Sequence, residues 1–482
     1  MIRHNDGSQR ELEFISIEEL VPPDHLLRQI DSRIDFSFVR DRLYPLYCSD
    51  NGRPAVDPEV LFRMVFIGYL YGIRSERELI RQIEVNVAYR WFLGYGLRDK
   101  IPHHSTISQN RRRRFEGTDV FRELFEDVVV LAIKAGYVTG ESLYTDSTHL
   151  KANANKHKFK KKRVRANVRK YLEELDDSIN ADRKSRGKKE FPPREDDPPE
   201  KDIKQSTTDS DSGFMTREGK PRGFYYLDHR TCDGMHNLIT DVHLTPASIS
   251  DSLVYPERLD YQCDRFGFDV EEVGVDAGYN TPNICRELVK RGIFGVVGYQ
   301  KPGGKRGLFR KSRFTYDSES DSYLCPEGHR LKYSTTTRRG FCQYASNPHI
   351  CKNCSRLTEC THSRIHRKVI TRHVWEKYKE EISNNRTSDR GKAIKQRRRE
   401  TVERSFADAK ELHGYRYARF RGRKRVEEQC LMTAIVQNIK KIATLLGKSP
   451  DNPLKTCKNH LLKYLNRIFE SINPPESYTL KT

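Results

Sequence analysis

Two aspartates each follow an apolar segment that is typical of a buried β-strand. Asp146 stands in LYTDST and Asp276 stands in VGVDAGYN, where a glycine-containing turn follows. If the two strands are neighbours in one sheet, both carboxylates meet at one edge. Hard oxygen ligands that converge in this way suit Mg²⁺ or Mn²⁺. Either aspartate alone could instead simply begin a turn.

A third carboxylate is expected from a basic helical segment, RRRETVERSFADAKELHG, near the C-terminus. Arg399, Glu403 and Lys410 are spaced by four and seven residues, so all three project from one helix face. Glu403 could complete the metal site while the two cations hold phosphate. Glu400, one turn away, is a rival ligand. The alternative is a surface helix with many salt bridges and no site.

A cysteine cluster predicts a second metal, bound by sulfur. Five of the eleven cysteines lie in residues 325–360, within a CPEGH motif, a C-x2-C pair and two further positions. This crowding suits a reducing compartment and a closed structural zinc site better than a disulfide framework. The expected ligands are Cys325, Cys351, Cys354 and Cys360, with Cys342, His329, His349 and His362 as substitutes. The alternative is a set of free thiols in a basic loop.

The order of apolar segments predicts the sheet that would position the two aspartates. The expected elements are a strand ending near Asp146, strands at 223–231 and 236–244, a helix at 249–262, a strand ending at Asp276, a helix at 281–292 and a strand at 293–299. Strand, hairpin, helix, strand, helix and strand in this order are typical of a mixed α/β sheet of the ribonuclease H type. Residues 183–222 are charged and of low complexity, which predicts a flexible insertion.

The N-terminal part is expected to be helical and to contact DNA. Asp57 and Ser75 are candidate N-caps of two helices with apolar residues at helical spacing. PHHSTISQNRRRRF then offers Ser105 as a cap before a basic helix, the arrangement that a helix-turn-helix uses to enter the major groove. The expected DNA contacts are Ser105, Thr106, Arg111 and Arg112. The alternative is an ordinary helical bundle with solvated arginines.

The charge of the whole chain agrees with a polyanionic partner. The 482 residues include 88 Lys and Arg against 67 Asp and Glu, which gives a formal net charge of +21. Such an excess is the electrostatic footprint of phosphate binding. No apolar run approaches the roughly 18 residues that cross a bilayer, and the first residues lack the apolar stretch of a signal peptide.

With these motifs in order, the chain resembles a bacterial insertion-sequence transposase of the DDE class over nearly its whole length. DSTHLKANANK and VDAGYNT resemble the motifs of the first and second aspartates, and TDVHLTPASISDS resembles the strand between them. Arg399, Glu403 and Lys410 match R-x3-E-x6-K of the Y-x2-R-x3-E-x6-K signature, whereas position 396 is Gln instead of the signature tyrosine. This register favours Glu403 over Glu400. Similar family members also carry a cysteine-rich insertion before the glutamate helix.

The resemblance implies metal-dependent cleavage at transposon ends and transfer of the freed 3′-hydroxyls to target DNA. Asp146, Asp276 and Glu403 would be the catalytic residues and would hold two Mg²⁺ or Mn²⁺ ions, with Arg399 and Lys410 on phosphates near the cut. The partners would be double-stranded DNA, both terminal inverted repeats and target, and a second copy of the chain, because two ends are cut together. The alternatives are a DNA-binding relative without catalysis and a nuclease that cleaves without joining.

The predicted fold is α/β, with a ribonuclease H-like catalytic core, an N-terminal helical DNA-binding domain and a small zinc-binding insertion. Location in the cytoplasm of a bacterium or archaeon, at the nucleoid, is expected. The expected domains are residues 1–125 (helical, DNA-binding), 138–300 (first part of the core), 301–372 (zinc-binding insertion), 373–447 (glutamate helix and closing helices) and 448–482 (helical tail).

Overall fold

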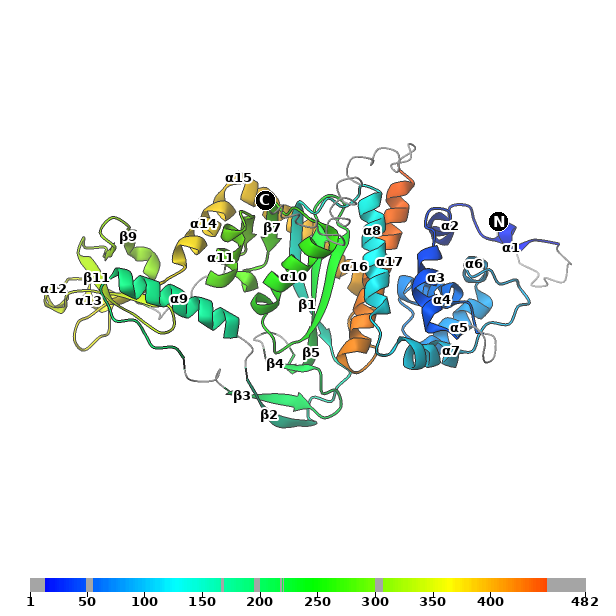
Figure 1. Ribbon diagram of the computed structural model, residues 1–482, viewed down its shortest axis with the longest axis horizontal. Helices are drawn as coiled ribbons and strands as arrows, with labels where there is room; N and C mark the ends of the chain where they lie inside the picture. Colours follow the sequence, from blue (N-terminus) through cyan, green and yellow to red (C-terminus); the bar gives the residue numbers. More distant parts are fainter. Residues whose placement is uncertain are drawn as a thin grey trace, which may run out of the picture.

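The computed structural model describes residues 14–48, 55–165, 169–194, 200–216, 219, 221–299 and 307–448. Three parts follow one another along its longest axis (Figure 1): a group of N-terminal helices, a large central sheet with its helices, and a small sheet at the opposite end. The architecture is mixed α/β, as expected. The predicted helical tail lies outside the described residues from position 449 onward. None of the described helices is long and apolar enough to cross a membrane.

The N-terminal helices pack around a cluster of phenylalanines. The elements are α1 (Ile17–Leu20), α2 (Leu26–Asp31), α3 (Ser37–Leu43), η1 (Tyr44–Leu46), α4 (Pro58–Leu70), α5 (Glu76–Val85), α6 (Val87–Phe92), α7 (His104–Asn110), the π-helical turn η2 (Arg111–Phe115) and α8 (Val120–Lys134). The ring of Phe36 lies about 6 Å from those of Phe66 and Phe92. Such aromatic contacts add packing energy to the apolar area that they bury.

Two of the three N-cap residues that the sequence predicted are the N-caps in the structure. The carboxylate of Asp57 accepts from the backbone N–H of Glu59, and the hydroxyl of Ser75 accepts from that of Glu78, so both predicted N-caps are confirmed. The prediction for α7 was wrong by two residues. Its N-cap is His103, whose imidazole accepts from the N–H of Ser105, because a ring nitrogen can satisfy a free helical N–H as a hydroxyl does.

The central sheet holds all the predicted core strands. Its strands are β1 (Ser142–Lys151), β2 (Phe159–Arg165), β3 (Glu200–Ser206), β4 (Gly213–Met215), β5 (Gly223–Asp233), β6 (Ile239–Pro246), β7 (Glu272–Val275) and β8 (Phe294–Val297). The order is β2-β3-β4-β5-β1-β7-β8, and β6 also pairs with β5. Strand β1 is antiparallel to β5 and parallel to β7, which is in turn parallel to β8. One strand of the sheet therefore joins an antiparallel half to a parallel half.

The segment expected to be a flexible insertion contributes to this sheet. Within residues 183–222, the described parts include β3, which pairs along its whole length with β2, and β4, which pairs with the start of β5. Strand β2 carries FKKKRVR, a basic stretch without the apolar alternation that marks a half-buried strand. Backbone pairing with β3, rather than burial of side chains, gives this segment its extended form.

Two helices connect the strands, and a helical segment from the C-terminal part covers them. These elements are α10 (Asp251–Phe266), η3 (Ala277–Tyr279), α11 (Pro282–Lys290), α14 (Glu376–Thr387), α15 (Asp389–Arg398), the π-helical turn η5 (Arg399–Glu403), α16 (Arg404–Leu412) and α17 (Arg423–Leu446). Gly274 allows α15 to approach β7, because a Cβ there would lie 3.2 Å from Ile394 and 2.7 Å from the ring of Tyr144.

The long helix α17 joins the N-terminal helices to the sheet. It packs against α4, α8 and β6, and most of its residues from Val426 to Ala443 are buried. Helices α8 and α17 lie side by side between the blue N-terminal helices and the green strands (Figure 1). The N-terminal helices and the sheet thus share one hydrophobic core.

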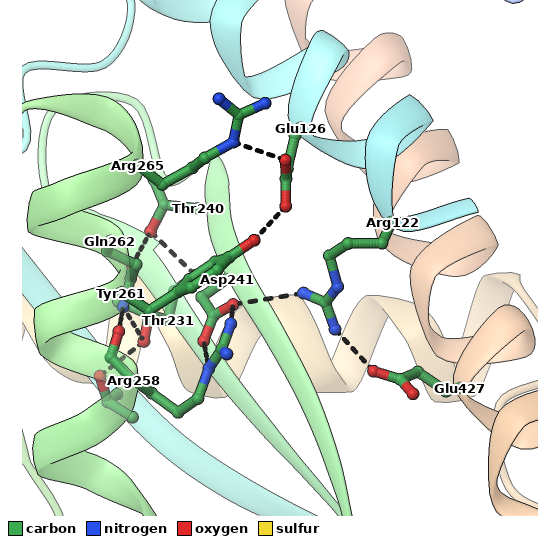
Figure 2. A network of polar contacts seen from close by, with 11 residues as sticks. Arg122, Glu126, Thr231, Thr240, Asp241, Arg258, Tyr261, Gln262, Arg265 and Glu427 are labelled. Carbon is green, nitrogen blue, oxygen red and sulfur yellow. Dashed lines mark hydrogen bonds and ion pairs between the residues drawn. The ribbon is translucent and has the colours of Figure 1, made fainter. Parts of the chain in front are cut away.

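A buried polar network fixes α8 and α17 to β6 and α10 (Figure 2). Asp241 of β6 accepts from Arg258 over 2.8 Å and lies 3.5 Å from Arg122, whose other nitrogen donates to Glu427 over 2.6 Å. Glu126 accepts from Arg265 over 2.6 Å in the same region. The acidic and basic groups balance one another, which is the condition for burying them at low cost.

The small sheet lies between β8 and α14 in the chain. It has the strand order β13-β12-β11-β10-β9 and is entirely antiparallel. Its elements are η4 (Lys311–Arg313), β9 (Thr315–Asp317), β10 (Ser322–Leu324), β11 (Arg330–Thr336), β12 (Phe341–Ala345), α12 (Pro348–Lys352), α13 (Leu357–Cys360) and β13 (Val369–His373). The sheet has its own small core around Tyr323 and Tyr344, and α9 (Arg169–Ser185) packs beside it.

Candidate active site and cysteine cluster

Asp146 and Asp276 lie side by side where β7 ends. The expectation that the first strand ends near Asp146 was wrong, because β1 continues to Lys151 through its pairing with β5. Residues of the parallel strands β1 and β7 pair with a constant offset of 130, so that Thr145 faces Val275. The next residue on each strand is an aspartate. Asp146 is largely buried and accepts a hydrogen bond from the backbone N–H of Ser147 over 2.8 Å, whereas Asp276 is about half exposed. The predicted meeting of the two aspartates is therefore present.

The turn η5 brings Glu403 and Arg398 to the same place. Arg398 ends α15, and its guanidinium donates to Asp146 Oδ2 over 2.9 Å and to Glu403 Oε1 over 2.6 Å. The same guanidinium lies 3.7 Å from Asp276 Oδ1. In a regular α-helix, residues five apart point about 140° away from each other. The wider π turn reduces that angle, which allows Arg398 and Glu403 to meet.

A buried arginine beneath the site holds the glutamate-bearing helix on the sheet. Arg230 of β5, the register partner of Asp146, is fully buried. It donates to Asp228 over 2.9 Å and to the hydroxyl of Ser405 over 2.8 Å. Ser405 follows Glu403 by two residues, so this bond ties the position of η5 and α16 to the strand next to β1.

The electrostatics of the site come from three carboxylates around one cation. Burial raises the pKa of Asp146, and the charge of Asp276 acts in the same direction, while Arg398 opposes both. Tyr279, whose buried hydroxyl has no partner within the described residues, lies near the same aspartates. Burial raises the pKa of its phenol well above the usual value, and the charges of Asp251, Asp146 and Asp276 act in the same direction. The site as it stands strongly favours a positive charge at its centre.

The side chains around Glu403 separate the two glutamates that the sequence left as rivals. Glu400 is about half exposed and lies 3.3 Å from Gln396 and 3.5 Å from Arg397, away from the aspartates. Lys410 donates to Thr148 over 2.7 Å, on the strand that carries Asp146. Arg399 is exposed on the outer side of the turn. Geometry therefore places Glu403 and Lys410 at the site and leaves Arg399 on the surface.

A divalent cation fits the chemistry of the three carboxylates, although Arg398 now lies between them. All three groups offer hard oxygen atoms to one point, as Mg²⁺ requires. Within the described ranges, no three His, Cys, Asp or Glu side chains stand close enough to hold a metal ion as placed. At the three carboxylates, the guanidinium of Arg398 explains why the oxygens are too far apart to share an ion, because this planar group is wider than a metal ion and lies between them.

The four cysteines expected as zinc ligands line one small cavity of the outer sheet. The cavity, of about 40 Å³, has Cys325, Cys351, Cys354 and Cys360 in its wall. Burial raises the pKa of Cys360, and the other three thiols are close enough to act in the same direction. Among the substitutes, only His329 lines this cavity. Cys342 is buried elsewhere, where its thiol lies 3.4 Å from the hydroxyl of Thr336, so it is unsuited as a ligand.

The four residues expected to contact DNA do not share one environment. Arg111 is nearly buried, forms ion pairs with Glu76 and Glu428, and stacks on Phe420 at 4.5 Å. Its side chain thus links η2 to α5 and α17 instead of facing solvent. Ser105 bonds to His103 over 2.8 Å, and Thr106 is half-buried. Arg112 is exposed and free of this network.

Sequence reasoning missed Arg398, the residue that contacts all three carboxylates. The R-x3-E spacing pointed to Arg399 instead, and helical periodicity places position 398 on a different face from Glu403. The only local signal was the run of three arginines before Glu400. A π turn within a helix has no clear mark in a single sequence, so the error of one residue could not be corrected from spacing.

Two family models match separate parts of the chain. A family model described as a transposase domain (DUF772) matches residues 15–113, which are the N-terminal helices up to η2. A second, described as a transposase DDE domain, matches residues 324–443, which include the cysteine cluster, Glu403 and most of α17. No curated protein matches the chain. The two matches together support a DDE transposase of an insertion sequence, a class of enzyme that acts on DNA in transposition.

Proposed function

We propose that Asp146, Asp276 and Glu403, here called the carboxylate triad, form the catalytic centre of this transposase and hold Mg²⁺ or Mn²⁺. The observation that carries the proposal is their convergence on Arg398 from three separate elements. Three acidic groups around a single cation repel one another and lower stability. Their convergence therefore indicates a functional role for the cluster. Glu400, on the same helix, points elsewhere and is not part of the triad.

The strand arrangement supports a ribonuclease H-like core. If β6 is taken as the neighbour of β5, five strands of the sheet have the order β6-β5-β1-β7-β8. The first three pair antiparallel, and β1, β7 and β8 pair parallel. This is the order expected from strand, hairpin, helix, strand, helix and strand. The triad then lies where β7 ends beside the middle of the central strand β1, with the third carboxylate supplied by a helix that covers them.

Each residue of the proposed site would have a separate role in phosphodiester cleavage. A divalent ion held by the triad would activate water or a 3′-hydroxyl and neutralise charge on the leaving oxygen. Lys410, held against β1 by Thr148, is placed to orient a phosphate beside Asp146. Arg399 projects outward from the same turn and would meet the DNA backbone further from the cut. Attack by an activated oxygen requires no covalent bond between protein and DNA.

The remaining parts would position the DNA. We assign DNA binding to the N-terminal helices, with Arg112 as an exposed contact on the basic turn after α7. The cysteine cluster would hold a structural Zn²⁺ through Cys325, Cys351, Cys354 and Cys360, which stabilises a sheet with a very small core. The substrate would be the terminal inverted repeats of the element, and cutting two ends together would require at least a dimer on DNA.

The proposal is tested by cleavage of a labelled duplex that carries the terminal repeat of the element, in Mg²⁺ and in Mn²⁺. Asp146→Asn, Asp276→Asn and Glu403→Gln are each expected to bind the duplex and to lose cleavage by at least a factor of about 100, since positioned electrostatic groups contribute on this scale. Glu400→Gln is the matched control, because it removes a charge from the same helix outside the triad.

The outcomes separate the candidate functions. Cleavage that is followed by joining of the 3′ ends to a second duplex supports a transposase that is active in this copy. Cleavage without joining would favour a nuclease, and binding without cleavage in either metal would favour a DNA-binding relative. Full cleavage by Glu403→Gln together with loss in Glu400→Gln would overturn the assignment of the third ligand.

A further inference from the structure

An open groove of about 670 Å³ lies between the N-terminal helices and the segment that connects α16 to α17. Its walls come from α4, the start of α5, α7 with its π turn, and the residues around Arg419 and Phe420. We call it the basic groove, because six arginines line it against one acidic residue, Glu76. The six are Arg74, Arg77, Arg111, Arg112, Arg419 and Arg425.

Most of this positive charge lacks an acidic partner in the described part of the chain. Arg111 and Arg425 are paired, with Glu428 and Glu116 respectively. No ion pair of the other four arginines occurs among the described residues. Arg74, Arg77 and Arg112 are all exposed along the groove. Like charges so close together repel one another unless an anion lies between them.

Arg419, in the wall of the groove, has no acidic partner among the described residues and only part of its hydrogen bonds. Its guanidinium lies over the ring of Tyr69 at 4.1 Å and donates to the carbonyl oxygen of Ile73 over 3.2 Å. Its other two nitrogens, Nε and Nη2, are buried without a hydrogen-bond partner in the described residues. Burial lowers the pKa of Arg419, and the charges of Arg74 and Arg111 lower it further. An unpaired buried donor is costly, and a bound anion would offset that cost.

The segment that leads into the basic groove is hydrogen-bonded to the end of β1, the strand that carries Asp146. The backbone N–H of Ala418 donates to the carbonyl of Lys151, the last residue of β1, over 2.8 Å. Tyr417, about half exposed, has Lys151 at 5.6 Å and Arg74 at 5.4 Å from the centre of its ring. A line of basic and aromatic groups thus leads from the end of β1 into the groove.

The length of β1 sets the distance between the site and the groove. Five residues separate Asp146 from Lys151, which corresponds to about 17 Å along a strand. Successive nucleotides of one DNA strand are spaced by about 3.4 Å along the duplex axis. The groove therefore begins on the order of five nucleotides from a phosphate that lies at Asp146.

We propose that the basic groove binds the sugar-phosphate backbone of one strand of the transposon-end DNA, on the order of five nucleotides or more from the cut. The inference rests on the proposed function, in which the triad acts on that DNA. A chain of phosphates suits separate guanidinium groups spread along an open channel, because each arginine can hold a different phosphate. Binding there would also fix the N-terminal helices relative to the catalytic strand on the substrate.

The test measures the salt dependence of binding of full-length protein to a fluorescent 30-base-pair duplex of arbitrary sequence. Each lost phosphate contact should reduce the slope of log affinity against log salt by about 0.9. Arg77→Gln/Arg112→Gln is therefore expected to lose about 2 units of slope and about tenfold in affinity at low salt. Both residues are exposed, so the fold should be kept, which a thermal melt verifies. Lys184→Gln, an 80% exposed lysine on α9, is the matched control.

A second measurement places the contact on the DNA. In the terminal-repeat duplex, a methylphosphonate is placed singly at each position up to ten nucleotides from the cut. Wild type should bind less tightly when the neutral linkage lies about five to eight nucleotides away. The double variant should show no additional loss there. Arg419→Gln should behave like the double variant if its melt shows that it folds.

The results distinguish this inference from the proposed function. If wild type cleaves terminal-repeat DNA but the double variant keeps the wild-type slope and affinity, the groove is not a backbone site and the catalytic proposal stands. If wild type shows no salt-dependent affinity for DNA, both fail. An equal reduction of slope by Lys184→Gln would mean that any surface cation contributes, which also overturns the inference.

Discussion

Arg398 donates a hydrogen bond to Asp146 Oδ2 over 2.9 Å, and this contact places a permanent positive charge at the meeting point of the triad. A guanidinium cannot lose its proton under ordinary conditions, so it neutralises part of the acidic cluster at any pH at which the protein is folded. The same position is the one that a divalent cation would take. Arg398 and the metal are therefore expected to compete for the same oxygens.

Replacement of Arg398 by Gln tests this competition. Without the guanidinium, the triad carries more unbalanced negative charge, so we expect Mn²⁺ to bind about tenfold more tightly in the absence of DNA. The measurement is a titration of free Mn²⁺ by electron paramagnetic resonance. Arg404→Gln is the control, because Arg404 is an exposed cation on the next turn that is paired with Asp408. Weaker binding in Arg398→Gln would show instead that Arg398 holds the carboxylates in place for the metal.

The buried network of Figure 2 makes a prediction about stability. Asp241 is 2% exposed and faces both Arg258 and Arg122. Asp241→Asn would leave the poorly solvated guanidinium of Arg258 without a counter-charge, whereas Arg122 would keep its ion pair with Glu427. The loss is expected to cost about 3 kcal/mol and to lower the melting temperature by several degrees. Asp408→Asn breaks an exposed pair with Arg404 and should cost less than about 1 kcal/mol. Similar melting of the two variants would contradict the role assigned to the network.

The cysteine cluster predicts that the protein contains a metal that depends on the four thiols. We expect purified protein to contain about one equivalent of zinc, and Cys351→Ser or Cys354→Ser to lose it, because a tetrahedral site needs all four ligands. Elemental analysis and a melting curve with and without chelator measure both effects. Cys263→Ser, which changes a thiol on α10, should keep the zinc. Zinc that remains in both cluster variants would exclude the assigned ligands.

The parts of the fold that follow from local chemistry could be predicted, and the parts that follow from long-range packing could not. The apolar runs before Asp146 and Asp276 identified two strands, and the constant offset between β1 and β7 then placed the aspartates together. The caps at Asp57 and Ser75 were readable because one side chain satisfies one helical N–H. Strand β2 was not, because its form depends on pairing with β3.

The same division applies to the site. Glu403 was chosen by a motif, and the observed contacts of Glu400 with Gln396 and Arg397 separate the two glutamates by geometry. Arg398 could not be predicted, because α-helical spacing places it on a different face from Glu403 and only the π turn brings the two side chains together. Arg111 looked like a DNA contact because it lies in a run of arginines, yet its ion pair with Glu428 involves a residue more than 300 positions away.

A buried histidine predicts how stability depends on pH. Burial lowers the pKa of His243, on β6, to about 4, and the nearby Arg258 acts in the same direction while Asp241 opposes it. The unfolded chain has the ordinary histidine pKa near 6.5, so between about pH 6.5 and 4 the unfolded state binds a proton that the folded state does not. Stability from this group is therefore complete above about pH 6.5 and decreases as the pH falls toward 4.

Urea unfolding at pH 7.5 and pH 4.5 measures this effect. His243→Gln removes the titrating group, so the loss of stability between the two pH values should be smaller than in wild type by about 1 to 3 kcal/mol. His157→Gln, at an exposed histidine, serves as the control and should keep the wild-type loss. An unchanged pH dependence in His243→Gln would mean that the pKa of His243 is not lowered by folding, so that the buried ring is protonated at pH 4.5. Its charge would then have to be accommodated next to Arg258 by the carboxylate of Asp241.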